Sequence, residues 1–340
     1  MSSYVEQMFT VSLPANFLSL DVRHEVLFNP YLSTTQEPQS VMKNIAVFGL
    51  GAMGYGIASS VLKAGYSTHG FDVVDTQVSR FQAEGGASGT LEQVAPDLDA
   101  VIVVVLNAAQ TESVLFGDDG IVPQLRKGAV VIACATVPPE FARQMESRCA
   151  DHAVLYLDAP ISGGAAKAAI GKLSVMASGT PDAFAAAKSV LDATAETVFT
   201  LGDSAGAGSA MKSVNQLLAG VHIATMAEAL TFGMTQGVTP DKFVEVISKC
   251  AGTSWMLENR APHIVDGDYT PLSSVNIWPK DLGIVLDIAS AAKFNAPITE
   301  AALRQFRTAA DMGLGSEDDA AVAKVYARDA RLTLPGETGS

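Results

Sequence analysis

Basic residues are scarce in this chain of 340 residues, because 22 lysines and arginines face 36 aspartates and glutamates. The resulting formal net charge of −14 disfavours nucleic acid, whose phosphates need a surface rich in lysine and arginine. It equally disfavours an anionic membrane surface as a partner. Charged residues of either sign make up only 17% of the chain, whereas 48% is hydrophobic, which suffices for two packed domains. The composition therefore predicts a globular protein whose partner is neither nucleic acid nor membrane.

Cysteine is also rare. Cys134, Cys149 and Cys250 are odd in number, lie far apart in the sequence and form no metal-ligand pattern. We expect reduced structural thiols in a cytoplasmic enzyme, and no metal site.

Targeting signals are missing as well. We expect no apolar run that is long enough to span a bilayer. Residues 1–41 have no basic start, contain Glu6 and Asp21, and are interrupted by Pro14 and Pro30, so they fit neither a secretory nor a mitochondrial signal. We expect a disordered extension without function there, and a start codon placed upstream of Met42 is the alternative.

Short β-branched or apolar runs recur after this segment, and stretches of helical character such as Met53–Ala64 and Phe81–Glu84 lie between them. The predicted strands are Asn44–Phe48, Ser67–Asp72, Ala100–Leu106, Ala129–Cys134, Val154–Leu157, Leu173–Ala177 and Thr197–Leu201. Continuous apolar strands such as Val101–Val105 are typical of a parallel sheet that helices cover on both faces. The alternation predicts a doubly wound, Rossmann-type α/β domain over residues 42–204.

The chain changes character after this domain. Ser209 to Gln236 contains no proline and many good helix formers, which predicts one long interdomain helix of roughly 40 Å that ends at Gly237. The remainder shows no convincing strand. We expect an all-α domain over residues 205–332 and a tail over 333–340 that frays from Pro335. The helices of this domain are expected to be separated by Pro262, Pro271, Pro279 and Pro297.

The first predicted strand runs directly into Gly49-Leu50-Gly51-Ala52-Met53-Gly54, a dinucleotide-binding fingerprint in its full strand–turn–helix context. Its glycines permit a tight turn, close approach of the backbone to a pyrophosphate, and close packing of helix on strand. The following helix directs its free N–H groups at the phosphates. A plain turn is the alternative for these glycines.

Asp72 ends the second strand, about 20 residues after the fingerprint, where a carboxylate accepts the ribose hydroxyls of NAD and repels the 2′-phosphate of NADP. No lysine or arginine follows until Arg80. The sequence therefore predicts NAD as the cofactor, and a plain strand-end residue is the alternative for Asp72.

Two later segments carry groups that can act on a substrate. In Asp158–Gly164 the adjacent Gly163 and Gly164 expose backbone N–H groups that suit a carboxylate, and Ser162 adds a hydroxyl donor. A tight turn and nothing more is the alternative.

In Gly206–Asn215, Lys212 and Asn215 lie three residues apart and so share a helix face. The small and apolar neighbours of Lys212 desolvate its amine and lower its pKa, as the positive nicotinamide ring does, which suits the proton acceptor of an alcohol dehydrogenase. The alternative is a solvated surface lysine.

Taken together, these motifs and Lys280-Asp281-Leu282 resemble the β-hydroxyacid dehydrogenase family, which includes 3-hydroxyisobutyrate dehydrogenases and tartronate semialdehyde reductases, over Lys43 to Tyr326. The resemblance implies that Lys212 is the catalytic acid/base and that Asn215 positions the substrate or the lysine. It implies that Ser162, Gly163 and Gly164 hold the substrate carboxylate. The implied cofactor-binding residues are Gly49, Leu50, Gly51, Ala52, Met53, Gly54, Asp72, Leu106, Asn107, Thr136 and Lys280. Among them Thr136 is expected at the nicotinamide ribose and Lys280 beside the cofactor, with a surface lysine as the alternative.

Two departures from the family pattern are visible. Ala135 stands where the family often has serine, and Asn107-Ala108-Ala109-Gln110 stands where many members have a proline after Leu106. The latter, together with Ser254–Arg260, His263 and Gly267–Tyr269, looks most like the L-threonate dehydrogenase branch. A polyhydroxylated acid needs several hydrogen-bonding groups, for which Asn107, Asn259 and His263 are candidates. The alternatives are a core position for Trp255 and a solvated turn for His263.

The resemblance implies NAD-dependent oxidation of a hydroxyacid, L-threonate to 2-dehydro-L-erythronate, by a homodimer or homotetramer. Tartronate semialdehyde reductase and 3-hydroxyisobutyrate dehydrogenase are the enzymatic alternatives. Lys212 counts against an imine reductase, because imine reductases typically replace this lysine. A non-catalytic NAD-binding scaffold is the alternative from another class.

Overall fold

The computed structural model describes residues 44–337, so the extension predicted over residues 1–41 lies outside the described residues. Eight strands form one sheet in the order β2-β1-β3-β4-β5-β7-β6, and β8 pairs with β7. The strands are β1 (Asn44–Phe48), β2 (Ser67–Phe71), β3 (Ala100–Val103), β4 (Val130–Ala133), β5 (Leu155–Asp158), β6 (Ile161–Ser162), β7 (Leu173–Gly179) and β8 (Ala195–Thr200). β1 to β5 pair in parallel, whereas β7 runs antiparallel to both β5 and β6.

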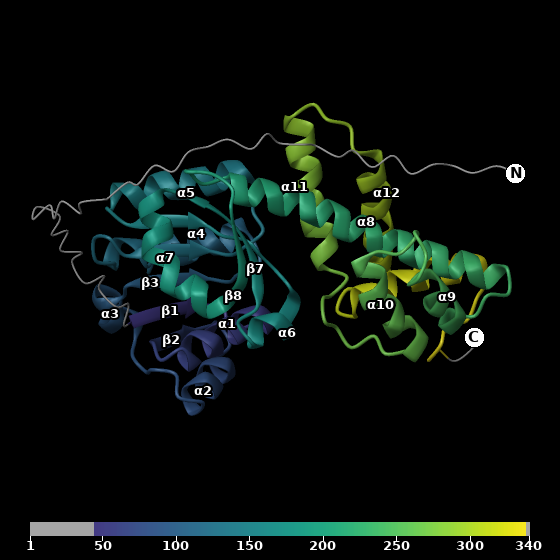
Figure 1. Ribbon diagram of the computed structural model, residues 1–340, viewed down its shortest axis with the longest axis horizontal. Coiled ribbons are helices and arrows are strands. Elements are labelled where there is room, and N and C mark those ends of the chain that lie inside the picture. The colour runs from purple at the N-terminus through teal and green to yellow at the C-terminus, as the bar shows by residue number, and fades with distance from the viewer. Residues whose placement is uncertain (1–43, 338–340) are drawn as a thin grey trace, which may run out of the picture. The chain divides into compact units, whose positions relative to one another are not determined.

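Helices alternate with these strands and cover both faces of the sheet (Figure 1). They are α1 (Ala52–Lys63), α2 (Asp75–Ala83), α3 (Leu91–Val94), α4 (Ala108–Phe116), α5 (Pro139–Asp151), α6 (Gly164–Ala169) and α7 (Pro181–Thr194). Ile45 and Val47 of β1 pack with buried side chains of α1 and α7, whereas Ala46 and Phe48 pack with those of α4 and α5. Successive residues of a strand face opposite sides, so a run of apolar residues supplies two cores. The predicted doubly wound α/β domain is confirmed.

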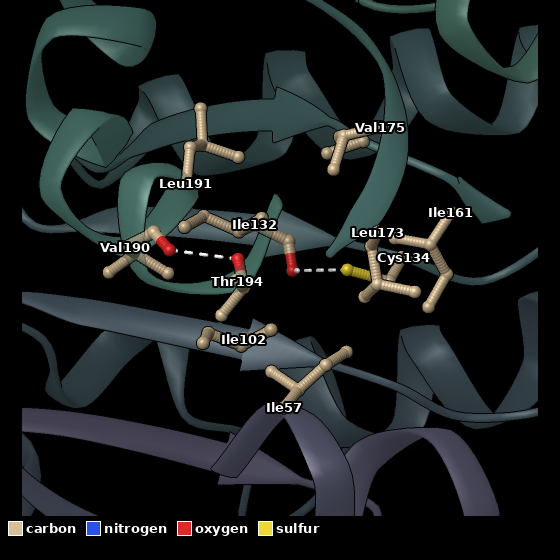
Figure 2. A pocket seen from close by; sticks show the side chains of 11 residues that line it. Ile57, Ile102, Ile132, Cys134, Ile161, Leu173, Val175, Val190, Leu191 and Thr194 are labelled. Carbon is tan, nitrogen blue, oxygen red and sulfur yellow. Dashed lines mark hydrogen bonds between the residues drawn. The ribbon is translucent and has the colours of Figure 1, made fainter. Parts of the chain in front are cut away.

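The core beneath α1 and α7 encloses a void of about 10 Å³ (Figure 2). Its lining residues are Ile57, Ile102, Ile132, Cys134, Ala159, Ile161, Leu173, Val175, Val190, Leu191 and Thr194. Thr194 Oγ1 donates a hydrogen bond to the Val190 carbonyl at 2.8 Å, and Cys134 Sγ lies 3.9 Å from the Ile132 carbonyl oxygen. The void is therefore lined by apolar groups and by polar groups that already have partners. At about the size of one water molecule it is a packing gap and not a ligand site.

The second half of the described chain is helical. Its helices are α8 (Ala207–Thr235), α9 (Pro240–Ile247), α10 (Trp255–Asp266), α11 (Ile277–Ala291), α12 (Pro297–Ala309) and α13 (Ala323–Ala330). The predicted long helix is confirmed as α8, which leaves the α/β domain and packs against α10 to α13 around Leu230, Trp278 and Phe306 (Figure 1). Leu334 lies within the predicted tail but is buried in this helical core, so packing extends beyond residue 332.

α8 corrects one expectation. By length and composition it could cross a membrane, since its most apolar 18-residue window has a mean hydropathy of 1.4, so the expectation that no such run exists is wrong. Within the described chain, however, α8 is the central helix of the helical core. The polar side chains of Lys212 and Gln216 are among those it buries.

Two prolines also correct the prediction. Pro262 lies inside α10 and Pro279 inside α11, so neither separates helices, whereas Pro297 opens α12 as expected. Pro279 is the third residue of its helix, where an N–H would have no partner within the helix. Pro262 removes one hydrogen bond, to the carbonyl of Glu258, but Glu258 is an exposed residue where solvent can replace that bond.

Candidate active site

The glycine-rich turn connects β1 to α1 with very little free space on its inner side. A Cβ on Gly54 would lie 1.8 Å from the carbonyl oxygen of Gly49, and Gly49 itself has a φ of +92°. Gly51, in contrast, would meet nothing within 4 Å. No side chain caps the start of α1, and its first turn carries no acidic residue. The turn thus leaves an open face over uncapped N–H groups, which fits the pyrophosphate of a dinucleotide.

Asp72 follows β2 and contacts this same turn. One carboxylate oxygen accepts from the Leu50 N–H at 2.6 Å, and the other accepts from the Val74 N–H at 2.8 Å. Each oxygen retains a lone pair for a ribose hydroxyl. Arg80, the first cation after Asp72, stacks over the Tyr55 ring at 4.1 Å and pairs with Glu84, so its charge is already engaged. This arrangement fits NAD better than NADP.

A hollow of about 460 Å³ opens beside the turn. Its lining includes Leu50, Gly51 and Ala52 from the predicted fingerprint, together with residues of α1, α2 and α6. It is the larger of the two hollows described here, and it brings part of the predicted cofactor site to an accessible surface.

The other predicted cofactor residues follow β3 and β4, which run parallel to β1 and so end at the same edge of the sheet. Leu106 is 61% exposed, and its carbonyl accepts from Lys280 Nζ at 2.6 Å, which ties α11 to this edge. Asn107 caps α4 by accepting from the Gln110 N–H at 2.8 Å. Thr136 lies half-buried between β4 and α5. The structure therefore brings the residues after β1, β3 and β4 together, with Lys280 beside them.

Ser162, Gly163 and Gly164 form the connection from β6 to α6. Gly163 and Gly164 both have positive φ, at 131° and 73°, so this turn requires glycine. Ser162 and Gly163 are half-buried, and Gly164 is exposed. The carboxylate cradle is predicted at this turn, and Gly164 is exposed to solvent there.

Lys212 lies on the second turn of α8 and is buried, with only 9% of the residue exposed. Its Nζ donates a hydrogen bond of 2.9 Å to the carbonyl of Ile161, the residue directly before Ser162. Burial lowers the pKa of Lys212 to about 8; the Asp281 carboxylate opposes this shift and the Lys280 ammonium adds to it. The alternative of a solvated surface lysine is therefore wrong, and the amine lies at the edge of the cradle with a fraction of neutral form near physiological pH.

The start of α8 is held by Asp158, the last residue of β5. Its carboxylate accepts from the N–H groups of Gly206 and Ser209, each at 2.9 Å. Burial raises the pKa of Asp158, while the hydrogen bonds from Ser209, Gly206 and Ser178 lower it. Asp158 opens the Asp158–Gly164 segment, but the sequence alone predicted no role for its side chain.

Gln216 and Asp281 were not predicted as site residues. Gln216 lies one helical turn beyond Lys212 and is buried, whereas the predicted Asn215 is only half-buried. Gln216 Nε2 donates to Asp281 Oδ2 at 2.5 Å, and its Oε1 accepts from Asn215 Nδ2 at 2.9 Å. Asp281 Oδ1 in turn lies 2.7 Å from Lys280 Nζ. The i,i+4 spacing from Lys212 is the signal that could have identified Gln216.

The residues proposed to contact a polyhydroxylated acid have partners within the chain. His263 Nδ1 lies 3.0 Å from Asp318, whose side chain is fully buried. The neighbouring Arg260, which was not among the candidates, pairs with Asp319 at 2.6 Å. Asn259 accepts from the Arg260 guanidinium. His263 is therefore part of a helix and an ion cluster, and a solvated turn is wrong for it.

Trp255 is 64% exposed at the start of α10, so a core position is wrong for this residue.

Two family models match consecutive parts of the chain. Residues 44–202 match the NAD binding domain of 6-phosphogluconate dehydrogenase, and residues 206–326 match the model described as NAD-binding of NADP-dependent 3-hydroxyisobutyrate dehydrogenase. The two matches meet between β8 and α8, where the α/β domain gives way to the helical one.

Individual relatives match nearly the full described length. An L-threonate dehydrogenase of Cupriavidus necator is 48% identical over 87% of this chain and 99% of that protein. One of Escherichia coli strain K12 is 43% identical over 86% of this chain and 97% of that protein. The crystal structure of a 3-hydroxyisobutyrate dehydrogenase from Salmonella typhimurium has a TM-score of 0.79 at 44% identity, covering 83% of this chain and 99% of that one.

Proposed function

We propose that this chain, which belongs to the β-hydroxyacid dehydrogenase family related to 3-hydroxyisobutyrate dehydrogenase, oxidises L-threonate to 2-dehydro-L-erythronate. The chain is an NAD-dependent hydroxyacid dehydrogenase. Relatives named L-threonate dehydrogenase, at 43–48% identity over most of the chain, support this substrate. The observation that carries the reaction is the buried Lys212 amine beside the Ser162–Gly164 turn.

We propose that Ser162 and the N–H groups of Gly163 and Gly164 bind the substrate carboxylate. The substrate hydroxyl then replaces the Ile161 carbonyl as the partner of Lys212 Nζ. Bound NAD supplies a hydride acceptor, held by the glycine-rich turn, Asp72 and the residues after β3 and β4. Lys212 in its neutral form removes the hydroxyl proton, and in the reverse direction its ammonium returns it. Oxidation should therefore accelerate as the pH rises through about 8, where Lys212 loses its proton, and reduction should slow.

We place the half-buried Asn215 at the substrate hydroxyls, because its neighbour Gln216 is occupied by Asp281. Asn107 and Asn259 are the other candidates; each accepts a hydrogen bond within the chain, and neither lies on the helix that carries Lys212. A site built around several hydroxyl-binding groups discriminates against analogues that lack them, because its polar groups are then left unpaired.

Parallel assays with NAD test the substrate. L-threonate, D-glycerate and 3-hydroxyisobutyrate are offered separately, and reduction of NAD is followed by absorbance. We expect kcat/KM for L-threonate to exceed the other two by roughly 100-fold, since 3-hydroxyisobutyrate lacks most of its hydroxyls. The highest kcat/KM for D-glycerate would instead favour a tartronate semialdehyde reductase, and for 3-hydroxyisobutyrate the corresponding dehydrogenase. Absence of turnover with every hydroxyacid would favour a non-catalytic scaffold.

We further infer that the enzyme works as a homodimer or homotetramer in the cytoplasm. Met211, Val214 and Leu218 are 44%, 54% and 49% exposed and are spaced three and four residues apart, which gives α8 an uncharged apolar face suited to a second copy of the chain. Light scattering should give a molar mass of at least twice 35.4 kDa, and Leu218→Asp should lower it. A wild-type mass of one chain would contradict self-association. The free thiols of Cys134, Cys149 and Cys250 support the reducing compartment.

A further inference from the structure

The first turn of α8 obtains its hydrogen-bond acceptors from another part of the chain. A helix begins with N–H groups that have no partner inside the helix, and these are usually satisfied by a side chain at its own N-cap. The N-cap of α8 is Gly206, which has no side chain, and no acidic residue lies in the first turn. Asp158 serves instead, from 48 residues earlier in the sequence.

The carboxylate of Asp158 accepts four hydrogen bonds, three of them from Gly206 and Ser209. Oδ2 accepts from the Gly206 and Ser209 N–H groups at 2.9 Å and from Ser178 Oγ at 3.2 Å, while Oδ1 accepts from Ser209 Oγ at 2.7 Å. Ser178 Oγ also accepts from the Gly208 N–H at 2.9 Å. Asp158 is only 1% exposed. Three of these four hydrogen bonds come from the N-cap and first turn of α8, and they fix both the position of this turn and its rotation about the helix axis.

The contact between Asp158 and Ser209 also fixes the position of Lys212. Ser209, which makes two of these bonds, lies three residues before Lys212, so the two share a helix face. Ile161, whose carbonyl accepts from Lys212 Nζ, lies three residues after Asp158. The backbone from Asp158 to Ile161 and the helix from Ser209 to Lys212 therefore form a closed frame, with hydrogen bonds at both ends. Gly208 completes the close approach, because a Cβ there would lie 2.7 Å from the Asp158 carbonyl oxygen.

We propose that Asp158 is a positioning residue of the dehydrogenase reaction, which holds the Lys212 amine against the substrate cradle by capping α8 from the end of β5. Asp158 acts through α8 and contacts neither substrate nor cofactor. The inference rests on the proposed role of Lys212. The charged groups that act on Lys212 are Asp281 and Lys280, both on α11 and both unchanged when Asp158 is replaced.

Asp158→Ala and Asp158→Asn test whether Asp158 acts by positioning α8 or through its negative charge. In Asp158→Ala all four acceptor contacts are lost, and we expect kcat to fall 10- to 100-fold, as for a catalytic group that is misplaced by about 1 Å. The midpoint of the pH–rate profile should move upward by on the order of one unit, because a displaced Lys212 is better solvated. Asp158→Asn keeps an oxygen for the two N–H groups and offers its amide N–H to Ser209 Oγ. We expect it to restore the wild-type midpoint and to keep kcat within about threefold of wild type.

The matched control is Asp318→Ala. Asp318 is also fully buried and also accepts backbone N–H groups, those of Leu272 and Ala320, but it lies in the helical core. The Asp318→Ala variant should have a lower Tm and an unchanged midpoint of the pH–rate profile, as expected when a carboxylate with a purely structural role is removed. A folded Asp158→Ala variant with wild-type kcat and midpoint would overturn the proposal, and so would an Asp158→Asn variant as impaired as Asp158→Ala.

If Asp158→Ala does not fold, Ser209→Ala decides the question, because it removes only the 2.7 Å bond to Oδ1. A smaller upward shift of the midpoint supports the proposal, and an unchanged profile overturns it. Full turnover by a Lys212 variant would instead contradict the role of the lysine, so the two failures can be told apart.

Discussion

Replacing Lys212 by Met is expected to lower kcat for hydroxyacid oxidation by about 10³-fold, while the dissociation constant for NAD stays within about threefold of wild type. Methionine keeps much of the length and the apolar stem of the side chain, so the buried volume is conserved and the amine is removed. The residual rate should lose the rise with pH that deprotonation of Lys212 near pH 8 gives the wild type. Steady-state kinetics between pH 6 and 10 and calorimetric titration with NAD provide the two measurements.

Lys280→Met is the matched control for this variant. Lys280 is also partly buried beside Asp281, but its amine donates to the Leu106 carbonyl on the cofactor side. We expect a higher KM for NAD with a kcat within about tenfold of wild type, because a positioning contact is lost and the acid/base group stays. Wild-type turnover by Lys212→Met would remove this lysine from the mechanism.

Gly54→Ala should lower the stability of the protein, whereas Gly51→Ala, three residues away, should leave stability unchanged and weaken NAD binding. The new Cβ at Gly54 would lie 1.8 Å from a backbone oxygen, which can give way only if α1 moves off β1. We expect a loss of about 3 kcal/mol in the free energy of unfolding and, at roughly 2–4 °C per kcal/mol, a Tm lower by about 10 °C. The Cβ at Gly51 meets nothing within 4 Å, so stability should be unchanged.

The expected effect of Gly51→Ala is on the affinity for NAD. The open face of Gly51 is where the pyrophosphate must approach the backbone, so Gly51→Ala should weaken NAD binding at least tenfold in a normally folded protein. Gly252→Ala, also without a neighbour within 4 Å but outside the fingerprint, should change neither quantity. Unaltered NAD affinity in Gly51→Ala would contradict the placement of the cofactor on this turn.

β3 and β4 were predictable because they are uninterrupted apolar runs, and β1, which is apolar after Asn44, begins and ends at the predicted residues. β6 was not, since Ile161–Ser162 has only two residues and exists through its pairing with β7. Pro262 and Pro279 were wrongly predicted to separate helices. Pro279 is tolerated because it lies in the first turn of α11, and Pro262 because the carbonyl that loses its partner belongs to an exposed residue, and neither condition can be read from the presence of a proline alone.

Candidate site residues could be named from the sequence where one short segment carries the whole pattern, as at the glycine-rich turn and around Lys212. They could not be named where a role needs two distant segments. The bond between Gln216 and Asp281 joins residues 65 apart, and the capping of α8 by Asp158 spans 48. His263 shows the converse, since a polar residue that suggested a substrate contact lies 3.0 Å from the buried Asp318 in the helical core.

The continuity of α8 restricts how the two domains can move. Its first turn is bonded to the end of β5, its turns from Ala219 onward belong to the helical core, and it contains no proline between Ala207 and Thr235. Hinge bending needs a few residues that can change φ and ψ freely, and an unbroken helix offers none without loss of its own hydrogen bonds. The contact of Lys280 with Leu106 adds a second tie between the domains. The domains should therefore behave as one rigid body, so that substrate exchange depends on the motion of side chains and loops.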